Sequence, residues 1–295
     1  MSVLSLLALG AALMAAEPVS TPVELESESA PLHGTLLRPE GRIEAAAIII
    51  AGSGPTDGDG NSPMGVRNSS LKQLAEGLAA QGIATVRIDK RGVARSTAAA
   101  TSEADLRFDA YVEDARAWPA QTVQQLDVSC VWLIGHSEGA LVAQSAATDT
   151  DSNICGQILL AGAGRPAGVV IREQLATLPE PLKTQAFEGV AELEAHADQA
   201  CRYVEDDPAA LARGSLGPIF IGQGTTDLQI SVDDAEALSI AQPMAAMKLW
   251  DGVNHVLIPA PADRAQNLET YGDPDAKIDP RVVNDVAAFI KDRTL

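Results

Sequence analysis

The pentapeptide from Gly135 to Gly139, G-H-S-E-G, matches the pattern G-x-S-x-G, in which the central serine is a nucleophile. An apolar run of strand length, Cys130 to Ile134, precedes it, and the helix-forming run Ala140 to Ala143 follows it. A serine on a sharp strand-to-helix turn needs neighbours without side chains, because the strand and the helix pass close to it. The pattern therefore predicts that the hydroxyl of Ser137 stands above the end of a sheet and attacks an electrophile there.

A serine nucleophile needs a base, and the base needs an acid that orients it. Among the four histidines, His255 is the best candidate, because it lies in the loop after the last predicted strand, where the sites of parallel sheets form. His33 falls in an early edge strand, and His196 falls in a region predicted to be helical. His136 lies in the turn itself, and its side chain is expected to point away from that of Ser137.

The acid is expected between Ser137 and His255 in the chain, since this turn motif goes with the order serine, acid, histidine. Asp227 is the preferred candidate, because it follows G-Q-G-T-T after the predicted strand at 216–221. Asp251 also follows a strand, but only three residues separate it from His255, which leaves little freedom to place its carboxylate. Asp251 is therefore the second candidate.

A negative charge that develops on a substrate oxygen needs two amide donors. The amide of Glu138 is one candidate, because it starts the helix after Ser137. The other is expected in the loop after the apolar run Ala45 to Ala51, where Ser53 is best placed. The glycine-rich loop from Gly52 to Gly60 lacks the G-K-[ST] ending of a phosphate-binding loop, so we interpret it as part of an oxyanion site.

Apolar runs of strand length alternate with helical segments, which predicts an α/β fold with a mostly parallel central sheet and helices on both faces. Residues 23–37 are expected to form two antiparallel edge strands. Further strands are predicted at 45–51, 83–88, 130–134, 157–160, 216–221 and 245–250, and helices at 70–81, 105–126 with an interruption near Pro119, 232–241 and 280–293. Residues 165–215 have helical patterning without a strand, and about 50 residues exceed an ordinary crossover, so we predict a helical cap there.

Together these features resemble the α/β-hydrolase superfamily, and within it bacterial exported hydrolases of the serine aminopeptidase-like or esterase-like kind. The resemblance covers residues 23–295 and rests on G-S-G-P-T-D at 52–57, G-H-S-E-G, D-K-R-G-V-A-R-S at 89–96, G-T-T-D and N-H. It implies one α/β-hydrolase domain over 23–295. The helical cap predicted at 165–215 is short for this family, which bears on the size of the substrate. The resemblance also implies a catalytic triad of Ser137, Asp227 and His255, with oxyanion amides at Ser53 and Glu138.

Within the segment from Asp89 to Ser96, the resemblance implies that Asp89 and Arg91 support a turn near the site. Ala94 stands where glycine is usual in that turn, which bears on the conformation of the loop.

The chain is acidic, with 40 acidic residues against 21 basic ones and a formal net charge of −19. A field of this sign disfavours nucleic acid and anionic membrane surfaces as partners, and polyanionic acyl-CoA as a substrate. The uncharged segment Met1 to Ala16 is too short to span a bilayer and resembles a signal peptide, although no basic residue precedes it. We therefore expect a periplasmic or secreted protein without stable membrane insertion.

Three cysteines are present, at positions 130, 155 and 201. Cys130 and Cys155 precede strands that are expected to be neighbours in a parallel sheet, so both should lie at the same end of it. Export permits disulfides, and we predict that these two cysteines pair and that Cys201 is free.

These observations predict a serine hydrolase that cleaves small carboxylic esters through an acyl-enzyme on Ser137. No metal or cofactor is expected, because the sequence has no His, Cys and carboxylate clusters with the spacing of metal ligands. An aminopeptidase-like peptidase that cleaves amides, or an acyltransferase or thioesterase, would use the same triad, and the sequence leaves these alternatives open. A catalytically inactive binding protein would require a missing triad member, and none is missing.

Overall fold

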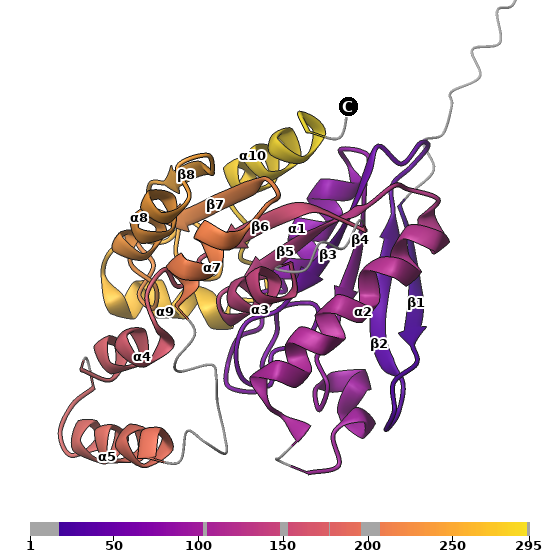
Figure 1. Cartoon of the computed structure of the whole chain (residues 1–295). Coiled ribbons are helices and arrows are strands. Elements are labelled where there is room, and N and C mark those ends of the chain that lie inside the picture. The colour runs from indigo at the N-terminus through magenta and orange to yellow at the C-terminus, as the bar shows by residue number, and fades with distance from the viewer. Residues whose placement is uncertain (1–17, 103–104, 148–152, 177, 196–206, 294–295) are drawn as a thin grey trace, which may run out of the picture.

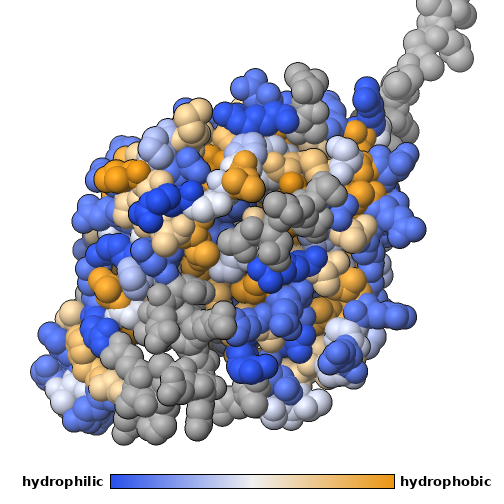
Figure 2. Space-filling view, in the orientation of Figure 1, coloured by the Kyte–Doolittle hydropathy of each residue, from blue (hydrophilic) through white to orange (hydrophobic). Residues whose placement is uncertain are grey.

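The computed structural model describes residues 18–102, 105–147, 153–176, 178–195 and 207–293. The predicted signal peptide at 1–16, together with His196 and Cys201, lies outside the described residues. No helix in the described ranges is both long enough and apolar enough to cross a membrane. Figure 2 shows hydrophilic residues over much of one face of the molecule, with hydrophobic residues in small groups between them.

An eight-stranded sheet runs through the centre of the molecule in the order β1-β2-β4-β3-β5-β6-β7-β8 (Figure 1). β1 and β4 both pair antiparallel with β2, and all the other neighbouring strands are parallel. The strands are β1 (Val19–Leu25), β2 (Leu32–Arg38), β3 (Ala45–Ile50), β4 (Ile83–Ile88), β5 (Val131–His136), β6 (Ile154–Leu160), β7 (Ile219–Gly224) and β8 (Ala246–Trp250). The predicted mostly parallel sheet is confirmed, with one correction: of the first two strands only β1 lies at an edge, because β2 pairs on both sides.

Helices cover both faces of this sheet (Figure 1). They are α1 (Ser70–Ala79), α2 (Phe108–Leu126), α3 (Glu138–Ala146), α4 (Ala167–Ala176), α5 (Leu182–Ala195), α7 (Pro208–Gly214), α8 (Val232–Ala241), α9 (Arg264–Gly272) and α10 (Pro280–Lys291), with a 3-10 helix at Ala94–Ala99. In β3, Ala47 and Ile49 pack with α1 and α10, whereas Ile48 and Ile50 pack with α2 and α3. Both faces of β3 are therefore buried, which explains why its sequence is apolar throughout.

α2 differs from its prediction, because the interruption expected near Pro119 is absent. A proline inside a helix costs about 3 kcal/mol, since it removes one backbone hydrogen bond and crowds the carbonyl four residues earlier. The residues around it, Ala115 and Trp118, are buried in the core that covers one face of the sheet. This packing keeps α2 continuous despite the proline.

The region predicted as a cap contains α4, α5 and α7, and its described residues form no strand. α7 packs against α3 and α8, close to the sheet, whereas α5 packs against α4. Figure 1 shows α4 and α5 at the lower left, with α5 farther from the sheet. The assignment of 165–215 as a cap stays a prediction.

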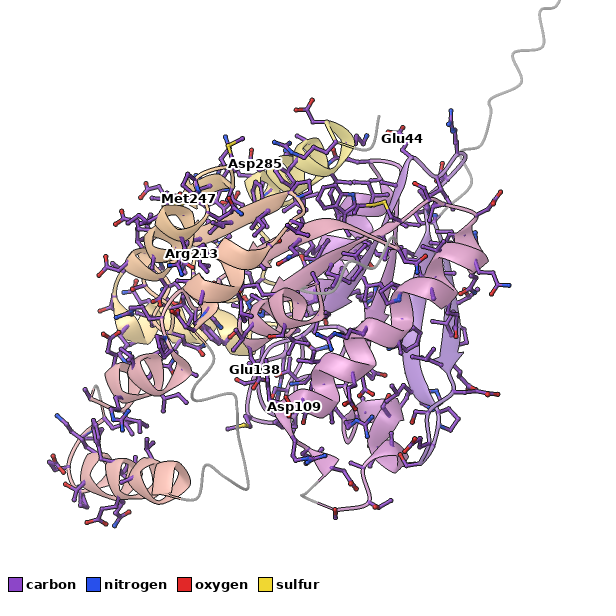
Figure 3. The ribbon with its side chains drawn as sticks, viewed as in Figure 1. Glu44, Asp109, Glu138, Arg213, Met247 and Asp285 are labelled. Carbon is purple, nitrogen blue, oxygen red and sulfur yellow. A yellow bond between two sulfur atoms is a disulfide. The ribbon has the colours of Figure 1, made fainter. Side chains whose placement is uncertain are left out.

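A disulfide joins Cys130 and Cys155, whose Cα atoms lie 5.3 Å apart. Cys130 directly precedes β5 and Cys155 lies near the start of β6, so the bond ties neighbouring parallel strands together (Figure 3). The predicted pairing is confirmed. Ser137 follows the other end of β5, so the disulfide fixes the strand at the end opposite to the predicted nucleophile.

Candidate active site

Ser137 forms a strained turn between β5 and α3, with φ 56° and ψ −124°. The turn is held by a hydrogen bond from the Ser137 amide to the carbonyl of Leu160, at 2.9 Å. A Cβ atom on Gly135 would overlap the carbonyl of Gly139, and one on Gly139 would overlap the carbonyl of Ile50. Both glycines of the motif are therefore required by the close approach of strand and helix, as the sequence predicts.

His255 lies in the loop after β8, and its Nδ1 donates to Asp227 Oδ2 at 2.8 Å. The other carboxylate oxygen of Asp227 accepts from the amides of Gln229 at 2.7 Å and Ile230 at 3.0 Å. Burial alone would raise the pKa of Asp227, but His255 and these hydrogen bonds outweigh it and hold the pKa below its usual value. The carboxylate is therefore ionised at neutral pH and fixes the orientation of the histidine ring.

The tautomer of His255 follows from this contact. A carboxylate only accepts, so Nδ1 carries a proton, and in the neutral ring Nε2 is then the acceptor. Ser137 and His255 both line one cavity of about 220 Å³, which we call the histidine-side cavity; it is also lined by Gly52, Ser53 and His136. Within the described residues the Ser137 hydroxyl forms no hydrogen bond, and catalytic contacts of this kind commonly tighten only when substrate binds.

The second candidate acid, Asp251, lies elsewhere. Its side chain is exposed and accepts from Thr225 Oγ1 at 3.2 Å. Asp227, and not Asp251, is the carboxylate placed against His255. His33, in β2, lies 3.5 Å from Glu24 and lines neither cavity at Ser137.

His136 contradicts the expectation that its side chain points away from Ser137. It is buried, it lines the histidine-side cavity, and its ring centroid lies 4.9 Å from that of His255. Its Nε2 donates to the backbone carbonyl of His255 at 2.7 Å. The alternation of side chains applies only within a strand, and the chain leaves β5 at Ser137, so the sequence rule fails at this position.

His136 is also neutral. Burial, and then the neighbouring His255 ring, lower the pKa of His136 to about 4. The neutral ring holds the loop of His255 without placing a positive charge beside it. The sequence gives no signal for this supporting role beyond the place of His136 in the motif.

The two predicted oxyanion amides belong to segments that meet at Ser137. Glu138 is the first residue of α3, and Ser53 lies in the loop after β3. Within the described residues neither amide donates to a protein acceptor. A Cβ atom on Gly52 would lie 3.0 Å from the Cβ of Ser137, which shows how closely the loop approaches the turn. Ser53, Ser137 and Glu138 together line a second cavity of about 220 Å³.

Asp89 and Arg91 have structural roles, as the resemblance implies: Asp89 contacts the loop after β3, and Arg91 contacts α2. Asp89 accepts from the amide of Gly58 at 2.9 Å, and Arg91 Nε donates to Asp114 at 2.8 Å. Ala94 adopts φ 46°, in the left-handed region that glycine occupies without a steric cost. The turn therefore keeps the conformation that suits the usual glycine, at the expense of local strain.

The chain matches a known protein family over more than half of its length. A family model described as "Serine aminopeptidase, S33" matches residues 64–228, more than half of the chain. The chain belongs to this family. Esterase EstD of Thermotoga maritima is 25% identical to this S33 family member over 280 residues, which cover 88% of the chain. The chain spans only 65% of the length of that esterase.

Solved structures establish the fold of this S33 family member. An esterase of Pyrococcus furiosus matches with a TM-score of 0.60 and 16% identity, covering 94% of each chain. A proline iminopeptidase of Mycobacterium smegmatis matches with a TM-score of 0.62 and 13% identity, covering 93% of this chain and 99% of its own. These likenesses, with the sheet order above, confirm the predicted α/β-hydrolase fold. The matched family is one of hydrolases, and the curated relative that matches the chain is named an esterase.

Proposed function

We propose that this hydrolase is a carboxylesterase that uses Ser137, His255 and Asp227 as its triad. The observation that carries the proposal is the 2.8 Å hydrogen bond from His255 Nδ1 to the buried carboxylate of Asp227, beside a cavity that Ser137 shares. This arrangement supplies the base, the acid that orients it and the nucleophile in the order that the chemistry requires.

In the proposed mechanism, Ser137 Oγ attacks the ester carbonyl and its proton passes to His255 Nε2. Asp227 stabilises the imidazolium through Nδ1, and the amides of Ser53 and Glu138 donate to the developing oxyanion. His255 then gives the proton to the departing alcohol, which leaves an acyl group on Ser137. A water molecule, deprotonated by His255, then attacks the acyl carbon, and His255 returns the proton to Ser137 Oγ as the acid leaves.

Each of the two cavities at Ser137 binds one part of the substrate. His255 has to protonate the leaving group, so the alcohol occupies the histidine-side cavity. The acyl group then occupies the second cavity, which His255 does not line and which we call the acyl cavity. Its apolar lining comes from α3, α4 and the loop before α8, and includes Leu141, Val170, Ile171 and Ile230.

The charges in the acyl cavity favour an uncharged acyl group. Among the described residues, two charged side chains line the cavity and both have partners: Glu138 lies 3.5 Å from Lys90, and Arg165 bonds to Asp234 at 2.8 Å and to Glu173 at 2.7 Å. An aminopeptidase substrate carries an α-ammonium group next to the scissile carbonyl, and burying that charge without a free carboxylate is unfavourable. This pairing supports the esterase proposal over the aminopeptidase alternative.

The p-nitrophenyl esters of butyrate and 2-aminobutyrate test whether the protein is an esterase or an aminopeptidase, because the two acyl groups differ only in the ammonium group. After correction for spontaneous hydrolysis, we expect kcat/KM for the butyrate ester to be higher by at least about tenfold, since only the ammonium is desolvated without a partner. Butyryl-CoA, assayed at low salt, should be a poor substrate in the field of a −19 protein. A preference for the 2-aminobutyrate ester would favour an aminopeptidase, and a preference for butyryl-CoA would favour a thioesterase.

We also propose that the protein is exported to the periplasm or the medium. The disulfide between Cys130 and Cys155 supports this, because disulfides persist mainly in oxidising compartments. Alkylation without reductant, followed by peptide mass spectrometry of protein from cell fractions, should find the disulfide-linked peptide outside the cytoplasm. Recovery of the protein only from the cytoplasm, with both cysteines alkylated, would contradict export.

A further inference from the structure

Lys90, in the turn after β4, is a buried lysine that the mechanism above does not use. Its side chain is only 3% exposed, which is rare for lysine without specific partners. Its Nζ donates to the backbone carbonyl of Gly52 and lies 3.5 Å from Glu138 Oε2. Nζ also lies 5.2 Å from the ring centroid of Tyr111. Lys90 therefore contacts the loop after β3 and the start of α3 with one ammonium group.

These two contacts fall on the segments that carry the oxyanion amides. The carbonyl of Gly52 and the amide of Ser53 belong to one planar peptide unit, and in a trans peptide they point in opposite directions. A donor that holds the carbonyl therefore fixes the direction in which the amide points. A cationic donor also polarises the peptide, which strengthens the hydrogen bond that the amide gives on its other side.

The second contact aligns the other donor. Glu138 is the first residue of α3 and directly follows Ser137 in the chain, and its side chain is labelled in Figure 3. The ion pair with Lys90 holds this residue against the loop that contains Gly52. Burial lowers the pKa of Lys90, and the carboxylate of Glu138 offsets part of that effect. The ammonium thus has a charged partner on one segment and a carbonyl partner on the other.

We propose that Lys90 is a positioning residue of the oxyanion hole, which orients and polarises the Gly52–Ser53 peptide and fixes it relative to α3. The proposal rests on the esterase mechanism above. A lysine with a merely structural role would stabilise the loops without changing how strongly an oxyanion at Ser137 is held.

The variant Lys90→Met removes the ammonium and keeps an apolar side chain of similar length. We expect kcat for p-nitrophenyl butyrate to fall on the order of 10–10²-fold with KM within about threefold, because a transition-state interaction is lost. The control is Lys72→Met, since the side chain of Lys72 is half exposed on α1 and its Nζ lies 4.0 Å from Glu76 on the same helix. Its kcat should match that of the wild type.

A trifluoromethyl ketone with a ¹³C-labelled carbonyl supplies the readout that separates positioning from stability. Its adduct with Ser137 is a hemiketal, whose ionisation can be titrated by ¹³C NMR. In Lys90→Met we expect the pKa of the hemiketal hydroxyl to rise by about 1, because the amide donors hold the anion less strongly. If circular dichroism shows that Lys90→Met does not fold, the double variant Lys90→Met with Glu138→Gln replaces it, because it also removes the carboxylate that has lost its partner. The hemiketal pKa should rise by the same amount in this double variant.

The outcomes separate this inference from the proposed function. If the wild-type protein forms the adduct and the folded Lys90→Met variant shows the same hemiketal pKa, only the role of Lys90 is overturned. Failure of the wild-type protein to form any adduct at Ser137 would overturn the esterase mechanism and this inference with it.

Discussion

Ser137→Ala is expected to lower kcat for ester hydrolysis by on the order of 10⁵–10⁶, because no other group can form the acyl-enzyme. The fold should survive, since the hydroxyl of Ser137 makes no hydrogen bond within the described residues and points into a cavity. The residual rate would come from substrate binding and the oxyanion amides. Stopped assays with p-nitrophenyl butyrate, on protein shown to be folded by circular dichroism, measure the loss.

A fluorophosphonate probe gives an independent measure of the same residue. The wild-type protein should be labelled once, and peptide mass spectrometry should place the label on Ser137. Ser129→Ala is the matched control, because Ser129 is exposed beside the disulfide and lies before β5, at the end of the strand opposite to the Ser137 turn. That variant should be labelled like the wild type. Labelling that persists in Ser137→Ala would mean that the nucleophile is another residue.

Asp227→Asn should lower kcat by on the order of 10²–10⁴ while the protein still folds. The reason lies in the two oxygens of the carboxylate. Oδ1 accepts from the amides of Gln229 and Ile230, so the oxygen of an asparagine will take that place. Its NH₂ group must then face His255 Nδ1, which becomes an acceptor. The proton moves to Nε2, and the histidine can no longer take the proton of Ser137.

Asp251→Asn is the control for this prediction, because its exposed carboxylate contacts Thr225 and not His255. We expect it to lose less than about tenfold in kcat. Both variants should be compared on one ester substrate after circular dichroism confirms their folds. A large loss of kcat in Asp251→Asn, together with an active Asp227→Asn, would show that the triad is assigned to the wrong acid.

The parts of the site that the sequence predicts are those set by local chemistry. The glycines around Ser137 are demanded by the turn itself, and the order of the elements places His255 and Asp227 at strand ends. The apolar run of β3 is predictable for the same reason, because burial on both faces leaves no polar position. Each of these signals lies within a few neighbouring residues.

The parts that the sequence does not predict depend on contacts between distant segments. Lys90 meets Gly52 and Glu138 only once β3, β4 and β5 lie side by side in the sheet. The continuity of α2 through Pro119 likewise depends on packing against the sheet, which outweighs local preference. α9 was not predicted because only Asn267 and Tyr271 of this helix are buried, so it has no apolar periodicity to detect.

In the proposed mechanism, the division of the space around Ser137 into two cavities also governs the second half of the reaction. The departing alcohol and the incoming nucleophile both exchange a proton with His255, so by microscopic reversibility they pass through the same histidine-side cavity. Once the first alcohol has left, water and any dissolved alcohol compete there for the acyl group. The ratio of transesterified product to free acid is then the partition ratio of the acyl-enzyme between the alcohol and water. This ratio reports how well that cavity binds the competing alcohol, independently of how the acyl group is held.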